Sequence, residues 1–530
     1  MRICSVHPNQ ATSPRRKARK ARRATLFSLA CMVCLATTAG APLADDEKAF
    51  TVYKLSVPDY LQRHWIEDLD NDGLKDILVV HRKGLPPDEL RWVSIFWQGT
   101  DGSFSTAADQ SWELDTEAVI LDIGDVVGDA RKEICYLTSK DVRYHTLEQD
   151  RYRVASDKLF DATGMAVYPS KSRVPLTNFV RDWNESGLDD VSVFTFDGLE
   201  IHSASEPGEY DSKQLVNIDL ETGMGISYSS GRDEMTAGLR ARYSFPDITL
   251  IDFDGTGRKD LVANTDDRMY VYLNNGNGSF STEADHEYFF DVLTQREKIE
   301  GTGDISADVV DLNNDGYADA IVSKLTSKGI TDFRGVVNVY WGGPNGYAET
   351  PDQVIISEGT ASVETLIWDV NGDGRRDLVL PSIKFSIAAV IRILITRSIR
   401  VYFNIYLLGE DDRFPDRPDF TKEVKFKLDF SGESDEQATD LKGDYNGDKR
   451  TDFVFATHED ELSIFLGVAD KDRLFSKKAV AKVKADAYGE LSSHDLNGDG
   501  YSDMVIHYPQ SKERQGTLEV LINLGRLDQD

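Results

Sequence analysis

Short apolar runs recur along the whole chain, and most of them follow directly on an acidic segment. Six of these runs begin at an aspartate and continue with aliphatic or aromatic residues: 76–80, 260–263, 319–322, 377–380, 452–455 and 503–506. Runs of this length that are bounded by turn residues are typical of buried β-strands. A second β-branched and aromatic segment follows, as at 271–273 or 337–341, and then a glycine-rich turn. The pattern predicts an all-β array of short strands.

The acidic segment is a nine-residue motif that occurs eight times. Its copies begin at Asp68, Asp125, Asp182, Asp252, Asp311, Asp369, Asp444 and Asp495, with intervals of 51 to 75 residues. About four short strands fit into a typical interval, and a propeller blade has four strands. The sequence therefore predicts a β-propeller of eight four-stranded blades. Seven blades is the alternative if the weakest copy does not build a blade.

The two ends of the chain together supply one more repeat. The segment from Asp495 to the C-terminus and the segment from Asp45 to Asp68 add up to the length of a typical interval. We therefore expect residues 50–56 to form the outer strand of the last blade. Pairing of the N- and C-terminal strands would close the ring and hide two sheet edges.

Two intervals are long and predict insertions near residues 207–247 and 382–408. The first insertion contains 221–231, a polar segment rich in glycine and serine that we expect to be a flexible loop. The second contains 385–396, which is apolar on most sides and is expected to be helical. Its short length and Arg392 argue against a membrane span. It is either an extra helix packed on the ring or an element that docks a partner.

The clearest copy of the motif, residues 68–76, has the features of a calcium loop. Carboxylates stand at positions 1, 3, 5 and 9 (Asp68, Asp70, Asp72 and Asp76), and the carbonyl of Leu74 is placed to be a further ligand. Calcium takes six to eight oxygen ligands in irregular geometry. The glycine at position 6 supplies the left-handed turn that such a loop needs. An EF-hand is excluded because position 12 is a valine in a strand-like run rather than a glutamate.

Three other copies are as complete, each with asparagine at position 3 and glycine at position 6. Their predicted ligands are Asp311, Asn313, Asp315 and Asp319; Asp369, Asn371, Asp373 and Asp377; and Asp495, Asn497, Asp499 and Asp503.

The remaining four copies lack the glycine, one or more of the acidic or amide ligands, or both. The seventh keeps its ligands but has Lys449 in place of glycine, so we expect weaker binding because a left-handed lysine costs about 1 kcal/mol. The third has only two carboxylates, and the second has Val127 and Ala130 at key positions and is expected to be a vestigial turn. In all, about four to six Ca²⁺ ions are predicted. The ligands in the seventh and fourth copies are Asp444, Asn446, Asp448 and Asp452, and Asp252, Asp254, Thr256 and Asp260.

Charge and the N-terminus indicate export. The chain has 60 basic and 91 acidic residues, a balance that repels nucleic acid and anionic membranes. Residues 1–44 have a basic segment, an apolar segment and small residues, the pattern of a signal peptide, with an uncleaved anchor as the alternative. The protein is therefore expected in the periplasm, at the cell surface or secreted. Beyond this segment only Cys135 remains, so calcium rather than disulfides would tie down the loops.

The motif Asp-x-Asp/Asn-x-Asp-Gly-x-x-Asp followed by an apolar strand resembles the FG-GAP/VCBS repeat family. Members include bacterial exported proteins and, more distantly, the integrin α-subunit propeller. The resemblance covers about residues 50–530. It implies a propeller of seven or eight blades with calcium in loops on one face. Because the chain has no Asp-x-Ser-x-Ser metal motif, the resemblance does not imply integrin-like ligand binding.

The sequence contains no familiar catalytic motif, and no catalytic residue is predicted. It has no phosphate-binding loop, no His-Glu-x-x-His and no Gly-x-Ser-x-Gly. Trp65, Trp183 and Trp368 flank the acidic loops and are expected to pack between blades rather than to stack on sugars. The favoured function is a binding or scaffold module for a protein or glycan. The alternative is a carbohydrate-active enzyme such as a calcium-dependent polysaccharide lyase.

Overall fold

The computed structural model describes most of the chain beyond residue 48. The described residues are 49–84, 88–165, 169, 177–230, 235–265, 267–276, 278–327, 333–358, 365–384, 386–427, 438–458, 460–470, 472–485 and 489–527. The predicted signal peptide, residues 1–44, lies outside this part. Residues 43–530 form one compact unit.

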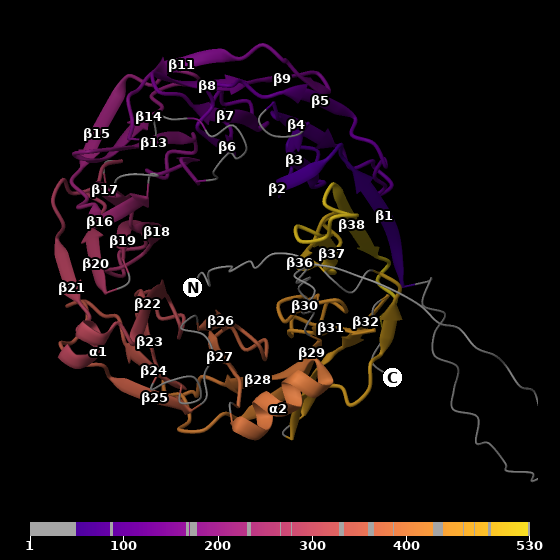
Figure 1. Ribbon diagram of the computed structural model, residues 1–530. Helices are drawn as coiled ribbons and strands as arrows, with labels where there is room; N and C mark the ends of the chain where they lie inside the picture. The colour runs from indigo at the N-terminus through magenta and orange to yellow at the C-terminus, as the bar shows by residue number, and fades with distance from the viewer. Residues whose placement is uncertain are drawn as a thin grey trace, which may run out of the picture. The chain divides into compact units, whose positions relative to one another are not determined.

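This unit is a ring of eight four-stranded antiparallel sheets, as predicted (Figure 1). The first four blades are β2 (Tyr60–Glu67), β3 (Asp76–Lys83), β4 (Leu90–Phe96) and β5 (Gln110–Glu113); β6 (Ile120–Gly124), β7 (Glu133–Leu137), β8 (Asp141–His145) and β11 (Asp157–Asp161); β12 (Val180–Arg181), β13 (Asp190–Thr195), β14 (Gly198–Ser203) and β15 (Ser212–Val216); and β18 (Asp247–Ile251), β19 (Asp260–Asn264), β20 (Arg268–Tyr272) and β21 (His286–Phe289).

The next four blades repeat the same order. They are β22 (Gly303–Val310), β23 (Asp319–Ser327), β24 (Phe333–Tyr340) and β25 (Gln353–Glu358); β26 (Leu366–Trp368), β27 (Asp377–Ser382), β28 (Ser398–Tyr406) and β29 (Phe420–Lys427); β30 (Thr439–Asp440), β31 (Phe453–His458), β32 (Glu461–Phe465) and β35 (Ala481–Val483); and β36 (Glu490–His494), β37 (Asp503–His507), β38 (Thr517–Asn523) and β1 (Phe50–Ser56).

Within a blade the first strand lies nearest the middle of the ring and the fourth lies outermost (Figure 1). Two small hairpins accompany the blades. They are β9 (Leu147–Glu148) with β10 (Arg151–Tyr152), and β33 (Gly467–Asp470) with β34 (Arg473–Phe475).

The ring closes as the repeat lengths predict. Strand β1 pairs with β38 over seven residues, from Phe50 opposite Asn523 to Ser56 opposite Thr517. The N-terminal strand is therefore the outer strand of the eighth blade, and both strands lose an open edge.

The core lies between neighbouring blades. The second strand of each blade follows an acidic loop and is buried on both of its faces; all five residues of β7 and of β37 are buried. Ile77 and Val79 of the first blade pack in one cluster with Val505 and Leu518 of the eighth. This packing explains why the runs are continuously apolar instead of alternating. The tryptophans follow the same rule, since Trp183 and Trp368 are buried and Trp65 packs against a core cluster.

The two insertions contain regular structure. The second insertion holds helix α2 (Ile387–Thr396), which confirms the predicted helix. The prediction of a flexible loop at 221–231 is wrong: β16 (Glu221–Ser230) pairs with β17 (Met235–Ser244) in a ten-pair antiparallel hairpin. Its glycines and serines are compatible with strands because backbone pairing supplies the hydrogen bonds. A second helix, α1 (Gln295–Glu300), was not predicted. No helix in the described ranges is long and apolar enough to cross a membrane.

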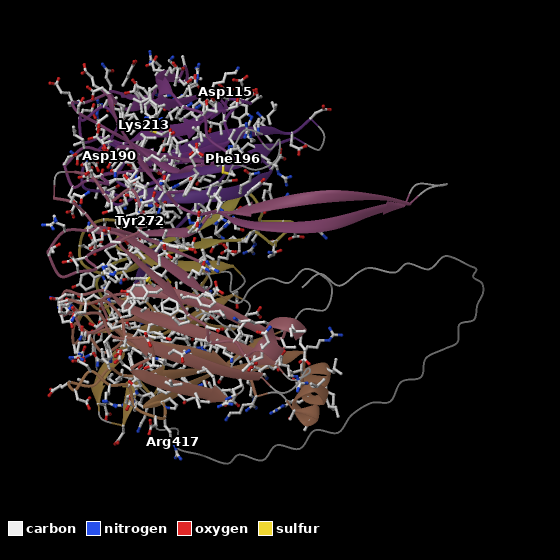
Figure 2. The ribbon with its side chains drawn as sticks, turned by 90° about the vertical axis from the view of Figure 1, so that its left-hand side faces the viewer. Asp115, Asp190, Phe196, Lys213, Tyr272 and Arg417 are labelled. Atoms are coloured by element: carbon white, nitrogen blue, oxygen red, sulfur yellow. The ribbon has the colours of Figure 1, made fainter. Side chains whose placement is uncertain are left out.

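The acidic loops and the insertions lie at opposite ends of the blade strands. Every acidic loop joins the first strand of a blade to the second, so all eight lie on one face of the ring, here called the loop face. Helix α2 follows the C-terminal end of β27, and the β16–β17 hairpin precedes the N-terminal end of β18. Both strand ends are opposite to the ends that carry the acidic loops. Helix α2 and the hairpin therefore lie on the other side, the insertion face. Figure 2 shows Asp190 and Phe196 toward opposite sides, with the hairpin projecting on the side of Phe196.

Candidate metal centre

All eight acidic loops have the same backbone conformation. In the first loop, the N–H of Asp72 donates to Oδ1 of Asp68 (3.1 Å) and the N–H of Gly73 donates to Oδ2 (2.9 Å). The aspartate at position 1 accepts the same pair of bonds in the other seven loops, including the second. The second copy is therefore a complete turn and differs only in its side chains.

Each loop has two left-handed residues, at positions 4 and 6. The sequence predicts the glycine at position 6, and Gly73 has φ +89°. The replacements there are left-handed too: Ala130 has φ +68° and Lys449 has φ +66°. The left-handed residue at position 4 was not predicted, although asparagine or glycine stands there in seven loops. The residues at position 4 are Asn71, Gly128, Glu185, Gly255, Asn314, Gly372, Gly447 and Gly498.

The aspartate at position 9 is buried and joins three segments of its blade. Asp76 accepts a hydrogen bond on Oδ2 from the N–H of Leu69 in the loop (3.2 Å) and on Oδ1 from the N–H of Gln98 beyond β4 (2.9 Å). The corresponding aspartates of the third to eighth loops accept the same two bonds. The link to the third strand is a structural role that the sequence motif does not reveal.

The carboxylates converge in the first and fourth loops. One oxygen each of Asp68, Asp70 and Asp76 lie within 4.8 Å of one another, and the same holds for the three aspartates of the fourth loop, 252, 254 and 260. A carboxylate oxygen that accepts one N–H keeps a second lone pair. These two loops therefore present several oxygen atoms, and no nitrogen or sulfur, toward one point.

In the three other complete loops, the fifth, sixth and eighth, an asparagine amide replaces the carboxylate at position 3. The Oδ1 of Asn313 accepts the N–H of Asp315 (3.2 Å), and its Nδ2 donates to Oδ2 of the same aspartate (3.0 Å). The sixth and eighth loops have the same arrangement. The seventh differs, since Oδ1 of Asn446 is buried and accepts no hydrogen bond from any described residue. A buried oxygen without a donor is a suitable ligand for a cation.

Burial works against ionisation of the position-9 carboxylates. Loss of solvent raises the pKa of Asp76 to about 7, although the two N–H groups that donate to it act in the opposite direction. The aspartates 319, 377, 452 and 503 have their pKa raised to about 7 for the same reason, and neighbouring loop carboxylates contribute. A divalent cation would offset both the burial and the repulsion. The residues present therefore fit an oxygen-liganded cation.

The comparisons with known proteins agree with the repeat structure. The model of the FG-GAP-like repeat family matches residues 68–136, 252–322 and 444–506. Each match begins at position 1 of an acidic loop and ends within the second strand of the next blade. No curated protein matches the sequence.

The solved structures that match are remote. A lectin of Agrocybe aegerita, described as recognising non-reducing terminal N-acetylglucosamine, is 14% identical and covers 88% of this chain and 100% of its own, with a TM-score of 0.35. The Dos1 propeller is 8% identical and covers 89% and 95%, with a TM-score of 0.41. Sqt1 from Chaetomium thermophilum is 10% identical and covers 91% and 100%, also at 0.41. The ring of eight blades and the three family matches identify the chain as a β-propeller protein that contains FG-GAP-like repeats.

Proposed function

We propose that this protein is an exported binding or scaffold propeller whose acidic loops are held by calcium. The observation that carries the proposal is the convergence of three carboxylates in the first and fourth loops. All donors are oxygens, and the loop is irregular, which suits Ca²⁺ better than ions that need regular geometry or softer ligands. The proposed ion count is about four to six.

Calcium in this proposal stabilises the fold and does not itself act on a substrate. Each loop connects the first two strands of its own blade, and in seven of the loops the position-9 aspartate reaches the third strand as well. An ion bound there would restrain the three innermost strands of that blade. The loops are spread around the whole ring, one in each blade, which is unlike a single catalytic centre. A rigid ring of this kind would present a protein or glycan partner with a fixed surface.

The calcium proposal is tested by thermal unfolding with and without chelator. We expect chelation to lower the melting temperature by several degrees, since an ion bound only by the folded state stabilises it by mass action. Asp373→Ala at position 5 of the sixth loop should remove part of that response. The matched control is Asp129→Ala at position 5 of the second loop, where Val127 replaces a ligand. A melting curve that is unchanged in excess chelator would refute the proposal.

The partner is tested with glycan arrays and protein pull-downs on the calcium-loaded protein. Binding without turnover supports a binding module. Incubation with acidic polysaccharides, followed by the absorbance of unsaturated products, tests the alternative; chelator-sensitive turnover would establish a lyase instead. Export is tested by fractionating the producing cells and sequencing the N-terminus of the recovered protein, with recovery of the full chain in the cytoplasm as the contrary outcome.

A further inference from the structure

Helix α2 exposes a contiguous apolar surface on the insertion face. Val390, Ile391, Leu394 and Ile395 have 36%, 52%, 65% and 76% of their surface exposed. Their spacing of one and four residues places them on one side of the helix. Ala389 is buried on the opposite side, which faces β28. These four residues, here called the α2 apolar face, have no partner among the described residues that covers them.

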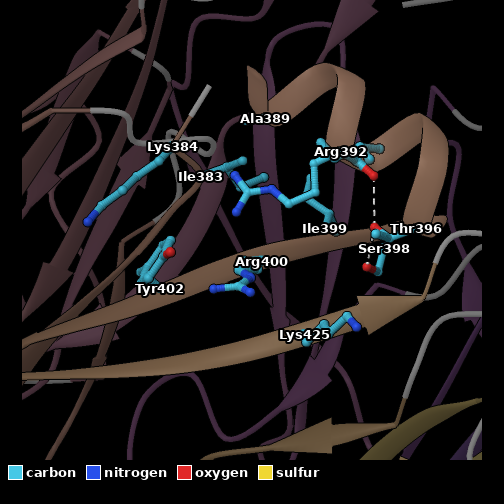
Figure 3. Close-up of a pocket in the computed structure, with 11 residues that line it drawn as sticks. Ile383, Lys384, Ala389, Arg392, Thr396, Ser398, Ile399, Arg400, Tyr402 and Lys425 are labelled. Carbon is cyan, nitrogen blue, oxygen red and sulfur yellow. Dashed lines mark hydrogen bonds between the residues drawn. The ribbon is translucent and has the colours of Figure 1, made fainter. Parts of the chain in front are cut away.

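The surroundings of this helix are basic, although the chain as a whole is acidic. The sequence has no aspartate or glutamate between Asp377 and Glu410. A small cavity of about 70 Å³ lies between α2 and the strands β28 and β29, and Figure 3 shows Lys384, Arg392 and Arg400 around it with Lys425 on the neighbouring strand. No carboxylate lines this cavity.

Of these four cations, one forms an ion pair and three have no acidic partner within the described part of the chain. Arg400 is paired with Glu423 at 2.9 Å. Lys384 places its Nζ 4.5 Å from the ring centre of Tyr402, which is a cation–π contact and not an ion pair. Neither Lys384 nor Arg392 nor Lys425 forms an ion pair with an acidic residue of the described ranges. The acidic loops lie on the other face of the ring, so the positive charge around α2 stands beside its exposed apolar residues.

We propose that α2 docks this protein onto an anionic lipid bilayer. The α2 apolar face enters the boundary between headgroups and acyl chains, and Lys384, Arg392 and Lys425 bind the phosphate and carboxylate groups of the lipids. An apolar helix with cationic residues beside it is the combination that lies in a membrane interface. The helix spans only ten residues and lies on the surface without crossing the bilayer.

The same charges disfavour the other occupants of this surface. A second copy that docked its own α2 would bring two basic clusters together, and like charges across an interface are repelled. A free phosphate would satisfy the cations but leave the four apolar side chains in water. An anionic bilayer satisfies both features at once, and its negative surface potential attracts cations near it.

The test is co-flotation of the full chain with lipid vesicles at constant calcium concentration. Wild-type protein should float with vesicles of phosphatidylcholine and phosphatidylserine and should bind pure phosphatidylcholine much more weakly. Leu394→Ser with Ile395→Ser should lower the affinity by about tenfold or more, because two exposed apolar side chains are lost. Arg392→Gln and Lys425→Gln should each lower it by about fivefold, the contribution of one cation near an anionic surface.

The control replaces two exposed apolar residues elsewhere on the ring. Val354 and Ile356 of β25 are 48% and 46% exposed, and Val354→Ser with Ile356→Ser should leave vesicle binding unchanged. Thermal unfolding of every variant verifies that the fold persists, as expected for exposed positions. Absence of wild-type flotation overturns the proposal, as does an equal loss in the control. A dimer in light scattering that Leu394→Ser disrupts, or inorganic phosphate binding without vesicle binding, overturns it in favour of a second copy or a soluble anion.

Discussion

At the scale of single residues, the position-9 aspartate has two roles: it is a predicted calcium ligand, and it accepts hydrogen bonds from two backbone N–H groups. Asp76 is a predicted calcium ligand, yet its two oxygens already accept N–H groups from Leu69 and Gln98. Among the described residues, the side chain of Asp70 accepts a single hydrogen bond, a long one from the N–H of Asp72 at 3.3 Å. Position 9 therefore supports the blade whether or not an ion is bound, while the role of position 3 would be to bind the proposed ion.

This difference predicts two kinds of mutant in the first loop. Asp76→Ala leaves two buried N–H groups without acceptors and should destabilise the protein by about 2–4 kcal/mol in both calcium and chelator. Asp70→Ala should lose only the calcium-dependent part of the stability and be nearly neutral in chelator. Urea denaturation under both conditions measures the free energies of unfolding. Equal behaviour of the two mutants would contradict the assignment of a structural role to Asp76.

A second prediction concerns the left-handed residue at position 6. Lys449→Gly should stabilise the protein by about 0.5–1 kcal/mol, because glycine adopts φ +66° without strain. Gly374→Ala in the sixth loop should destabilise it by about 1 kcal/mol, and an added Cβ there meets no atom within 4 Å, so the cost is conformational alone. Both values come from urea denaturation in chelator. Destabilisation by Lys449→Gly, or stabilisation by Gly374→Ala, would refute the strain argument.

The structural roles of loop residues were predictable from sequence only where one residue type recurs at the same position of the motif. The carboxylates and the glycine at position 6 were identified because their spacing recurs. The left-handed position 4 was overlooked since Glu185 occupies it in one copy, although glycine and asparagine elsewhere could have revealed it. The hydrogen bond from the N–H of Gln98 to Asp76 could not be predicted, because it joins segments 22 residues apart through a backbone N–H that any residue other than proline supplies.

At the scale of elements, apolar periodicity predicted the strands well and the insertions unevenly. The second strands are buried on both faces, so their sequences are unmistakable. Helix α1 is too short to show a period, but Thr294 and Glu297 form a capping box that could have indicated it. The β16–β17 hairpin was mistaken for a loop because its composition is polar and its partner strand is within the same insertion. Amino-acid composition alone does not predict that two such segments pair as strands.

The hairpin should open independently of the ring. Within the described part of the chain, strands β16 and β17 pair only with each other, and an isolated two-stranded hairpin is marginally stable in water. We expect the amides of Glu221–Ser230 and Met235–Ser244 to exchange hydrogen at least about a hundredfold faster than those of β19, which is buried between blades. Hydrogen exchange followed by mass spectrometry measures both in one experiment. Equal protection would mean that another surface covers the hairpin.

At the scale of the whole molecule, the junction between the first and eighth blades completes the ring. Its packing includes two neighbouring histidines, of which His507 is buried and His64 is partly buried. The rings of His64 on β2 and His507 on β37 are 5.5 Å apart. Burial lowers the pKa of His64 to about 3, with the charges of His507, His494 and Arg63 adding to the effect. Burial lowers the pKa of His507 to about 4, although Glu490 lies 3.7 Å from its Nδ1.

These lowered pKa values predict that the closing junction weakens in acid. An unfolded histidine has a pKa near 6.5, so between pH 6.5 and about 4 the unfolded chain binds protons that the folded chain does not. The stability is therefore complete above pH 6.5 and is lost as the pH falls, by about 1–2 kcal/mol per ring at pH 5. Urea denaturation at pH 7 and pH 5 should show this loss in wild-type protein and a smaller loss in His64→Gln with His507→Gln. The loop carboxylates, whose pKa values are raised, titrate with the opposite sign, but they are common to both proteins and cancel in the comparison. Equal losses would show that the proton uptake occurs elsewhere and that the blade junction tolerates charge.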